Sequence, residues 1–195
     1  MSSSQFYPAN EKDDHENLTL FDSSGRSLDC YIENSLEYKG SVYLLLIPCD
    51  SPVIILKESE EDLEEYDETI IIEEEEEITT VFADAKAVLA ELDLLLHHTA
   101  YTLTVTGELP PLDEEHIWNL EIEEDEPLLE QEELQWLACF YYDNERYNVC
   151  APINPLLFVA KDDPKDGLQL LSSADPELKE ILQELLLDDD LDDED

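Results

Sequence analysis

Histidine and cysteine are the side chains of this protein that most readily act as bases, nucleophiles or zinc ligands. Four of each are present: His15, His97, His98, His116, Cys30, Cys49, Cys139 and Cys150. A pair formed by His116 with Cys139 or Cys150 would be the candidate for nucleophilic catalysis. No Cys-x-x-Cys or His-x-x-x-His spacing occurs, so the pattern does not indicate zinc. We therefore predict that the protein is not an enzyme and that it has no catalytic residue, metal site or cofactor.

The cysteines each lie in or beside an apolar, strand-like run. This placement favours buried free thiols in a reducing compartment, with a Cys139–Cys150 bridge as the alternative if the geometry allows it. The N-terminal stretch MSSSQFYPANEKDDHENL is polar and has no apolar signal core, and no apolar run approaches the length of a membrane span. We expect a soluble cytoplasmic protein with no membrane insertion.

Carboxylates dominate the charged residues. The sequence contains 53 Asp and Glu but only 9 Lys and Arg, which gives a formal net charge of −44. The densest runs are 58–68, 113–126 and 188–195. None has the Asp-x-Asp-x-Asp-Gly spacing of a defined calcium loop, so we expect only diffuse counterions there. Direct binding of nucleic acid is disfavoured because phosphate contacts require Lys and Arg. The same charge attracts basic proteins.

One acidic run is assigned to partner binding: Glu73, Glu74, Glu75, Glu76 and Glu77. The preceding Thr69–Ile72 favours a strand. If the strand continued, Glu73, Glu75 and Glu77 would share one face, and the other two glutamates would lie opposite. Because acid on both faces cannot belong to a core, this strand must leave the folded body or end at its rim. We predict that the run contacts a basic protein partner.

The most apolar stretch of the first half is Val42–Lys57, in which two apolar runs flank a Pro-Cys-Asp-Ser-Pro turn. A second version appears as Tyr147–Lys161. Matching positions are Tyr43 and Tyr147, Pro48 and Pro152, Asp50 and Asn154, Pro52 and Pro155, and Lys57 and Lys161. This correspondence favours an internal duplication, in which each copy forms a sheet closed by a helix.

Alternation, apolar runs and turn residues predict strands at 17–22, 27–34, 42–47, 53–57, 69–72, 101–106, 117–122, 134–142, 145–151, 156–161 and 168–171. Asp143-Asn144 is expected to form a tight hairpin turn. Apolar spacings of three and four predict an amphipathic helix from Thr79 or Thr80 to about His97. His97 and His98 would then end that helix, where its dipole favours a cation. A second helix is expected to begin near Pro176.

These elements predict an α+β fold with two related lobes, each a small, mainly antiparallel sheet closed by one amphipathic helix. The first lobe covers residues 17–98 and the second covers 99–187. A disordered arm precedes them at 1–16, and a disordered acidic tail follows at 188–195.

The segments NLTLFDSSGRSLDCYIE and YKGSVYLLLIPCDSPVIIL, followed by an acidic run and a closing helix, resemble domain of unknown function 1292 over roughly residues 17–96. The Asp-x-x-Gly turn at Asp22–Gly25 is part of this resemblance. Most of the chain resembles the related domain of unknown function 3727, found in cyanobacteria and chloroplasts. Neither resemblance implies an established activity, catalytic residue or cofactor.

We rank three hypotheses about function. The first is a monomeric, non-enzymatic interaction module, or an assembly or regulatory factor, that binds a basic protein partner through its acidic elements. The second is a nucleic-acid mimic that occupies the basic groove of a nuclease, polymerase or ribosomal protein, which would require ordered carboxylates at phosphate-like spacing. The third is an enzyme, which would require a cleft where Cys, His and carboxylate converge from different strands.

Overall fold

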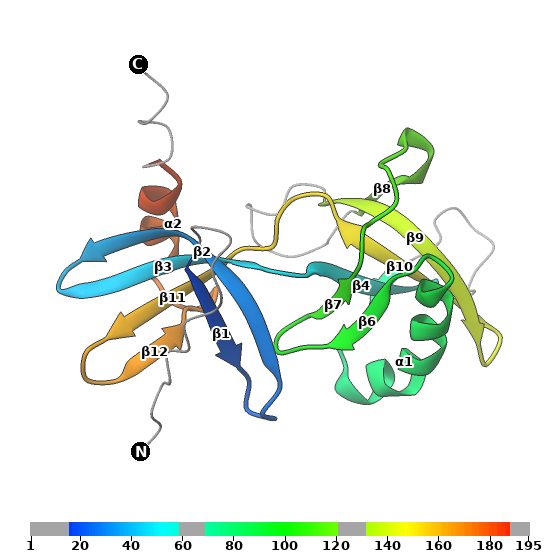
Figure 1. The fold of residues 1–195 in the computed structure, drawn as a ribbon, viewed down its shortest axis with the longest axis horizontal. Helices are drawn as coiled ribbons and strands as arrows, with labels where there is room; N and C mark the ends of the chain where they lie inside the picture. Colours follow the sequence, from blue (N-terminus) through cyan, green and yellow to red (C-terminus); the bar gives the residue numbers. More distant parts are fainter. Residues whose placement is uncertain (1–15, 59–68, 121–131, 188–195) are drawn as a thin grey trace. The chain divides into compact units, whose positions relative to one another are not determined.

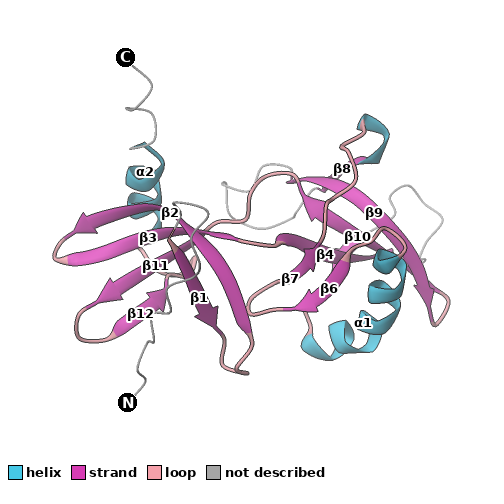
Figure 2. Cartoon of the chain, in the orientation of Figure 1, coloured by secondary structure: helices cyan, strands magenta, loops and turns pink. Residues whose placement is uncertain are grey.

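The computed structural model describes residues 16–58, 69–120 and 132–187. Its fold is α+β, as predicted, with two mainly antiparallel sheets and the helices α1 (Glu75–Ala90) and α2 (Leu178–Leu187) (Figure 2). The predicted arm at 1–16, the acidic run at 58–68 and the predicted tail at 188–195 fall almost entirely outside the described residues. Within the described ranges, no helix has both the length and the apolar character needed to cross a membrane.

The first sheet has the order β1-β2-β3-β11-β12 (Figure 1). Its strands are β1 (Asn17–Phe21), β2 (Ser27–Tyr38), β3 (Ser41–Pro48), β11 (Phe158–Asp163) and β12 (Gly167–Leu170). The second sheet has the order β6-β7-β4-β10-β9-β8, and β5 pairs with β4 beside this path. Its strands are β4 (Ser51–Glu58), β5 (Thr69–Ile71), β6 (Leu95–His98), β7 (Leu103–Thr106), β8 (Ile117–Leu120), β9 (Glu132–Tyr142) and β10 (Glu145–Pro152).

One compact unit, called the first unit, consists of the described residues among 1–20, 29–49 and 157–195. Its buried core is formed by Tyr43, Leu45, Val159, Ile181 and Leu185. Ile181 and Leu185 are four residues apart and therefore share one face of α2. The Nδ2 of Asn34 donates a hydrogen bond to the carbonyl of Leu185 over 2.7 Å, which satisfies one of the carbonyls left unpaired at the end of α2.

The second unit consists of the described residues among 21–28 and 50–156. Strand β4 lies at its centre, because β4 pairs with β5, β7 and β10. Helix α1 buries Val81, Ala85 and Leu89, spaced by four, in a core that the strands complete. A second, smaller cluster contains Leu56, Leu134 and Cys150.

Neither unit coincides with the predicted lobes 17–98 and 99–187. Strand β3 pairs with β11, and β4 pairs with β10, so each unit combines strands from both halves of the chain. The connection between β3 and β4 at residues 49–50 passes from one sheet directly into the other. Local patterning located the strands other than β6, but the pairing partners are set by packing between segments that are distant in sequence.

The predicted helix start at Thr79 or Thr80 is wrong, because α1 begins at Glu75, shortly after β5 ends at Ile71, before the acidic run. Glu75, Glu76 and Glu77 occupy the first helical turn, where the helix dipole stabilises negative charge. Thr79 and Thr80 are not caps. Their hydroxyls donate to the carbonyls of Glu75 and Glu76, one turn earlier within the helix.

The predicted helix end at His97 and His98 is also wrong, because α1 ends at Ala90 and both histidines lie in β6. Asp93 adopts a left-handed backbone with φ 59°, and the Leu94 N–H bonds the Leu89 carbonyl over 3.1 Å. This geometry terminates the helix as C-terminal caps do. By contrast, the Asp143-Asn144 turn is confirmed, since both residues have positive φ, 49° and 65°, between β9 and β10.

Candidate functional site

A cleft of about 330 Å³ lies within the second unit, at the start of α1. Its apolar lining comes mainly from β4 and β5 and from Ile78 of α1, and Val53 and Ile55 are almost fully buried there. Polar side chains from three separate segments reach the same cleft, namely Arg26, Glu75 and His98. An apolar lining with a few convergent polar groups is the usual composition of a binding site.

Arg26 is held by the turn that precedes β2. Asp22 Oδ1 accepts hydrogen bonds from the backbone N–H groups of Ser24 and Arg26, each over 2.9 Å. Its Oδ2 accepts from Arg26 Nε over 2.7 Å. Gly25 supplies the positive φ of 82° that this turn requires. The short Asp-Ser-Ser-Gly-Arg segment therefore helps to orient the guanidinium through contacts within the turn itself.

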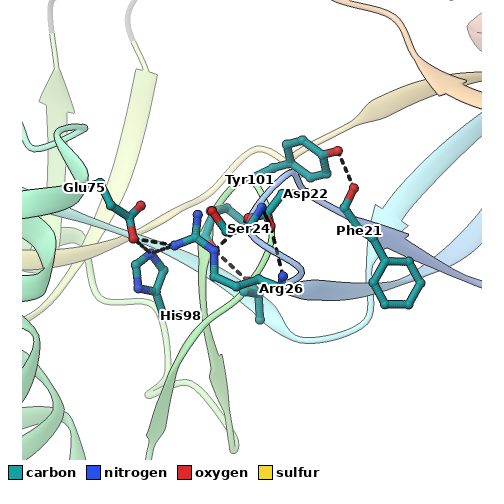
Figure 3. Close-up of polar contacts among 9 residues, drawn as sticks. Phe21, Asp22, Ser24, Arg26, Glu75, His98 and Tyr101 are labelled. Carbon is teal, nitrogen blue, oxygen red and sulfur yellow. Dashed lines mark hydrogen bonds and ion pairs between the residues drawn. The ribbon is translucent and has the colours of Figure 1, made fainter.

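The guanidinium reaches from this turn to the first turn of α1 (Figure 3). Its Nη1 donates to Glu75 Oε1 over 2.7 Å and lies 2.5 Å from His98 Nε2. An arginine can only donate, so His98 Nε2 is the acceptor in this contact. The His98 ring also stacks on Phe82, with centroids 5.9 Å apart. These contacts tie β6 and α1 to the turn before β2.

Burial disfavours the charged form of Asp22, but hydrogen bonds from the Arg26 side chain and from the two backbone N–H groups outweigh it and lower the pKa of this carboxyl. Hydrogen bonds to Glu75 and Asp22 in turn raise the pKa of Arg26. The arrangement stabilises charge on both partners, so it acts as a structural clamp on the cleft rather than as a source of a transferable proton.

Replacing Arg26 with Met should lower the free energy of unfolding by about 1 kcal/mol at neutral pH, because two partly exposed ion pairs are lost. The pKa of Asp22 is lowered in the folded protein, so its ionised carboxyl stabilises the fold at pH values above the ordinary pKa of Asp. This stabilisation is lost as the pH falls through the lowered pKa. Acidification should therefore destabilise the native protein more than it destabilises Arg26→Met. Urea titrations at neutral and acid pH measure the difference. Lys86→Met, at an exposed position of α1, removes the same charge and should preserve the native pH response.

The five predicted partner-binding glutamates take different roles in the structure. Glu75 pairs with Arg26, and Glu77 lies 3.6 Å from Lys57 Nζ, which also contacts Glu145 at 2.8 Å. Glu73, Glu74 and Glu76 are exposed and form no ion pair within the described ranges. Glu73 also lines the cleft. Three carboxylates are thus left to face solvent, and only Glu73 among them lines the cleft.

Tyr101 also belongs to this region, although the sequence patterns did not indicate it. Its hydroxyl donates to the Phe21 carbonyl over 2.8 Å, and its backbone has a positive φ of 66° (Figure 3). The Ala100 N–H bonds the Ser27 carbonyl over 3.1 Å. Together these bonds fix the segment between β6 and β7 against the turn that carries Arg26.

Apart from His98, none of the cysteines and histidines that the structure describes lines the cleft. All four cysteines fall in described ranges and none forms a disulfide there, so the Cys139–Cys150 bridge is absent. Burial raises the pKa of the Cys30 and Cys150 thiols to about 12, which makes them poor nucleophiles. His116 stacks on Trp136 with centroids 5.6 Å apart. The described residues hold no cluster of three or more His, Cys, Asp or Glu side chains that could hold a metal ion.

Comparison with known families identifies two regions. Residues 93–189 match the model described as Protein of unknown function (DUF3727), and residues 24–90 match Protein of unknown function (DUF1292). Both predicted families are thereby confirmed, although the DUF3727 match covers the second half of the chain rather than most of it. No curated protein and no solved structure matches the chain.

Proposed function

We propose that this chain, which joins a DUF1292 region to a DUF3727 region, has a non-enzymatic role and binds a basic segment of another protein. The contact surface, called the acidic helix start, consists of Glu73, Glu74 and Glu76 together with the adjoining cleft. The partner segment carries Lys or Arg for the carboxylates and an aliphatic side chain for the cleft. The observation that carries this proposal is the exposure of three carboxylates, one of which, Glu73, lines a partly apolar cleft.

Charge supports this choice of partner. Arg26 and Lys57 pair with Glu75 and Glu77, whereas the three other carboxylates of the run are exposed and form no ion pair among the described residues. The net charge of −44 adds a long-range field that repels anionic partners and speeds the approach of basic ones. Surface carboxylates set the association rate and the salt dependence, whereas burial in a cleft slows dissociation.

The cleft supports an aliphatic anchor in the partner. Its lining includes the partly buried aliphatic side chains Ile54, Ile71 and Ile78, and its volume lies at the low end for ligand pockets. Burying one aliphatic side chain contributes about 1.5–3 kcal/mol. A partner with only basic residues would lack this contribution and would bind with lower affinity.

Changing Glu73, Glu74 and Glu76 together to Gln should weaken binding of a labelled peptide of alternating Lys and Leu. We expect a loss of about tenfold, or roughly 1.4 kcal/mol, because each exposed charge contributes up to about 1 kcal/mol. The salt dependence of binding should fall at the same time. Fluorescence anisotropy at two salt concentrations measures both effects.

The matched control changes Glu91, Glu108 and Glu115 to Gln, which removes the same charge from exposed positions of the second unit. This variant should bind within about twofold of the native protein, since rim charges far from a contact add little. Equal losses in the two variants would reduce the proposal to non-specific attraction. A peptide of alternating Lys and Ser tests the cleft, because it should bind more weakly than the Lys–Leu peptide.

A further inference from the structure

The two sheets are assembled in the same order from exchanged parts of the chain. The first repeat is defined here as β1 to α1, without the β6–β7 hairpin that follows it, and the second repeat as β8 to α2. The first sheet reads β1-β2-β3-β11-β12, and the second sheet contains β8-β9-β10-β4-β5. In each case three strands come from one repeat and two strands come from the other. Figure 1 shows β3 beside β11, and β4 beside β10.

The register of the exchanged strands matches residue by residue. Tyr43 of β3 lies opposite Lys161 of β11, and Tyr147 of β10 lies opposite Lys57 of β4. Tyr43 corresponds to Tyr147, and Lys57 to Lys161, in the sequence repeat. In both pairs the ammonium lies over the ring, 5.6 Å and 5.9 Å from the centroid. Each contact therefore joins the tyrosine of one repeat to the lysine of the other.

Irregular features recur at the same places, which argues against chance. The pairing of β2 with β3 skips Glu33, and the pairing of β9 with β10 skips Leu137, so each hairpin has a bulge at the corresponding position. After these hairpins, the Cys49 N–H bonds the Asp29 carbonyl and the Ile153 N–H bonds the Glu133 carbonyl, both over 2.9 Å. The turn residues Lys39-Gly40 and Asp143-Asn144 all have positive φ.

The helices are exchanged as well. The buried residues of α1 share their cluster with Phe140, Tyr147 and Val149 of the second repeat. The buried residues of α2 share theirs with Tyr43 and Leu45 of the first repeat. Tyr43 also donates from its hydroxyl to Glu177, just before α2, over 2.9 Å. Neither repeat therefore packs its own helix on its own hairpin.

We propose that each repeat is the folding partner of the other, so that the protein is a strand-exchanged pair joined in tandem. Each repeat contributes two interaction surfaces. One is the edge of its own hairpin, β2–β3 or β9–β10, which pairs with a strand of the other repeat. The other is its own strand-and-helix segment, which packs on the hairpin of the other repeat. A repeat without its partner exposes the apolar edges of β3 and β4, or of β10 and β11, together with an uncovered helix face. Its matching partner is a second repeat of this same design.

Cutting the folded full-length protein tests this proposal. A protease site inserted after Pro111, beside the exposed Leu112, lies between the two repeats. After cleavage the two pieces should remain together in gel filtration. The thermal midpoint of the cut protein should rise by about 4 °C for each tenfold increase in concentration, because folding has become bimolecular. The uncut protein carrying the same insertion is the control, and its midpoint should not change with concentration.

Pieces that separate while each keeps native near-ultraviolet circular dichroism would overturn the proposal, as would a cut-protein midpoint independent of concentration. Pieces that lose structure on dilution and regain it on concentration would support it. Hydrogen exchange on the uncut protein gives an independent test through Leu45→Ala, a core change in β3. If the Leu45→Ala change speeds amide hydrogen exchange in β11 as much as in β3, relative to the native protein, the proposal is supported. Faster exchange in β3 and β4 without β11 contradicts it.

Discussion

Replacing Leu89 with Ala is expected to lower the free energy of unfolding of the second unit by about 3 kcal/mol, within the roughly 2–5 kcal/mol seen for buried leucines. Leu89 is fully buried in the cluster that joins α1 to the sheet. The cavity left by the smaller side chain would loosen the helix whose first turn carries the acidic helix start. Binding of the Lys–Leu peptide should therefore weaken along with stability.

Urea titration followed by tryptophan fluorescence measures this effect directly, because both tryptophans, Trp118 and Trp136, lie in the second unit. The control is Leu95→Ala, which removes the same atoms from a leucine of the same unit that is 47% exposed. Surface changes of this kind usually alter stability by no more than about 0.5 kcal/mol. Equal urea midpoints for the two variants would show that α1 does not depend on the Leu89 contact.

Replacing Gly107 with Ala is the second change with a large expected effect. Gly107 has φ 129°, and an added Cβ would lie 2.7 Å from the Asp93 carbonyl oxygen and 3.0 Å from a Leu94 methyl carbon. Both obstacles lie at the end of α1, where the backbone leaves the helix for β6. We expect a loss of about 3 kcal/mol, since the backbone strain and the overpacking each cost roughly 1–3 kcal/mol.

Gly25→Ala is the matched control, because Gly25 has φ 82° but a methyl group added there would have no atom within 4 Å of it. It should cost only about 1–2 kcal/mol, the penalty of a left-handed backbone without a steric clash. Thermal unfolding of both variants followed by tryptophan fluorescence provides the comparison. A Gly107→Ala protein as stable as Gly25→Ala would mean that the segment around Asp93 and Leu94 moves aside at little cost.

The candidate site combines one feature that sequence patterning found with several that it missed. The acidic run at Glu73–Glu77 was evident from composition. Arg26 and His98 were not, because nothing in their local sequence indicates that the two side chains meet in space. The Asp22–Gly25 turn was a usable signal, and Arg26 immediately follows it as one of only two arginines in a strongly acidic chain. That rarity makes an ion pair at Arg26 a reasonable expectation.

The acidic run also shows why local pattern and observed structure diverged. Ile70–Ile72 favours a strand, and Glu is a good helix former, so the local preferences change within a few residues. The helix extends back to Glu75 because Val81, Ala85 and Leu89 bury one face, and the added turn places three carboxylates at the positive end of the dipole. Tertiary packing thus chose between two preferences of similar strength.

The order of residues alone specifies the strong negative charge, the position of nearly every strand, the Asp143-Asn144 turn and the matching of Tyr43 with Tyr147, because each depends on composition or on neighbours a few residues apart. Only the folded chain shows that β3 pairs with β11 and β4 with β10, and that Arg26 meets Glu75 and His98. These contacts join segments far apart in sequence. They depend on which apolar faces bury each other and which edges find hydrogen-bond partners, and local preference carries no information about that choice.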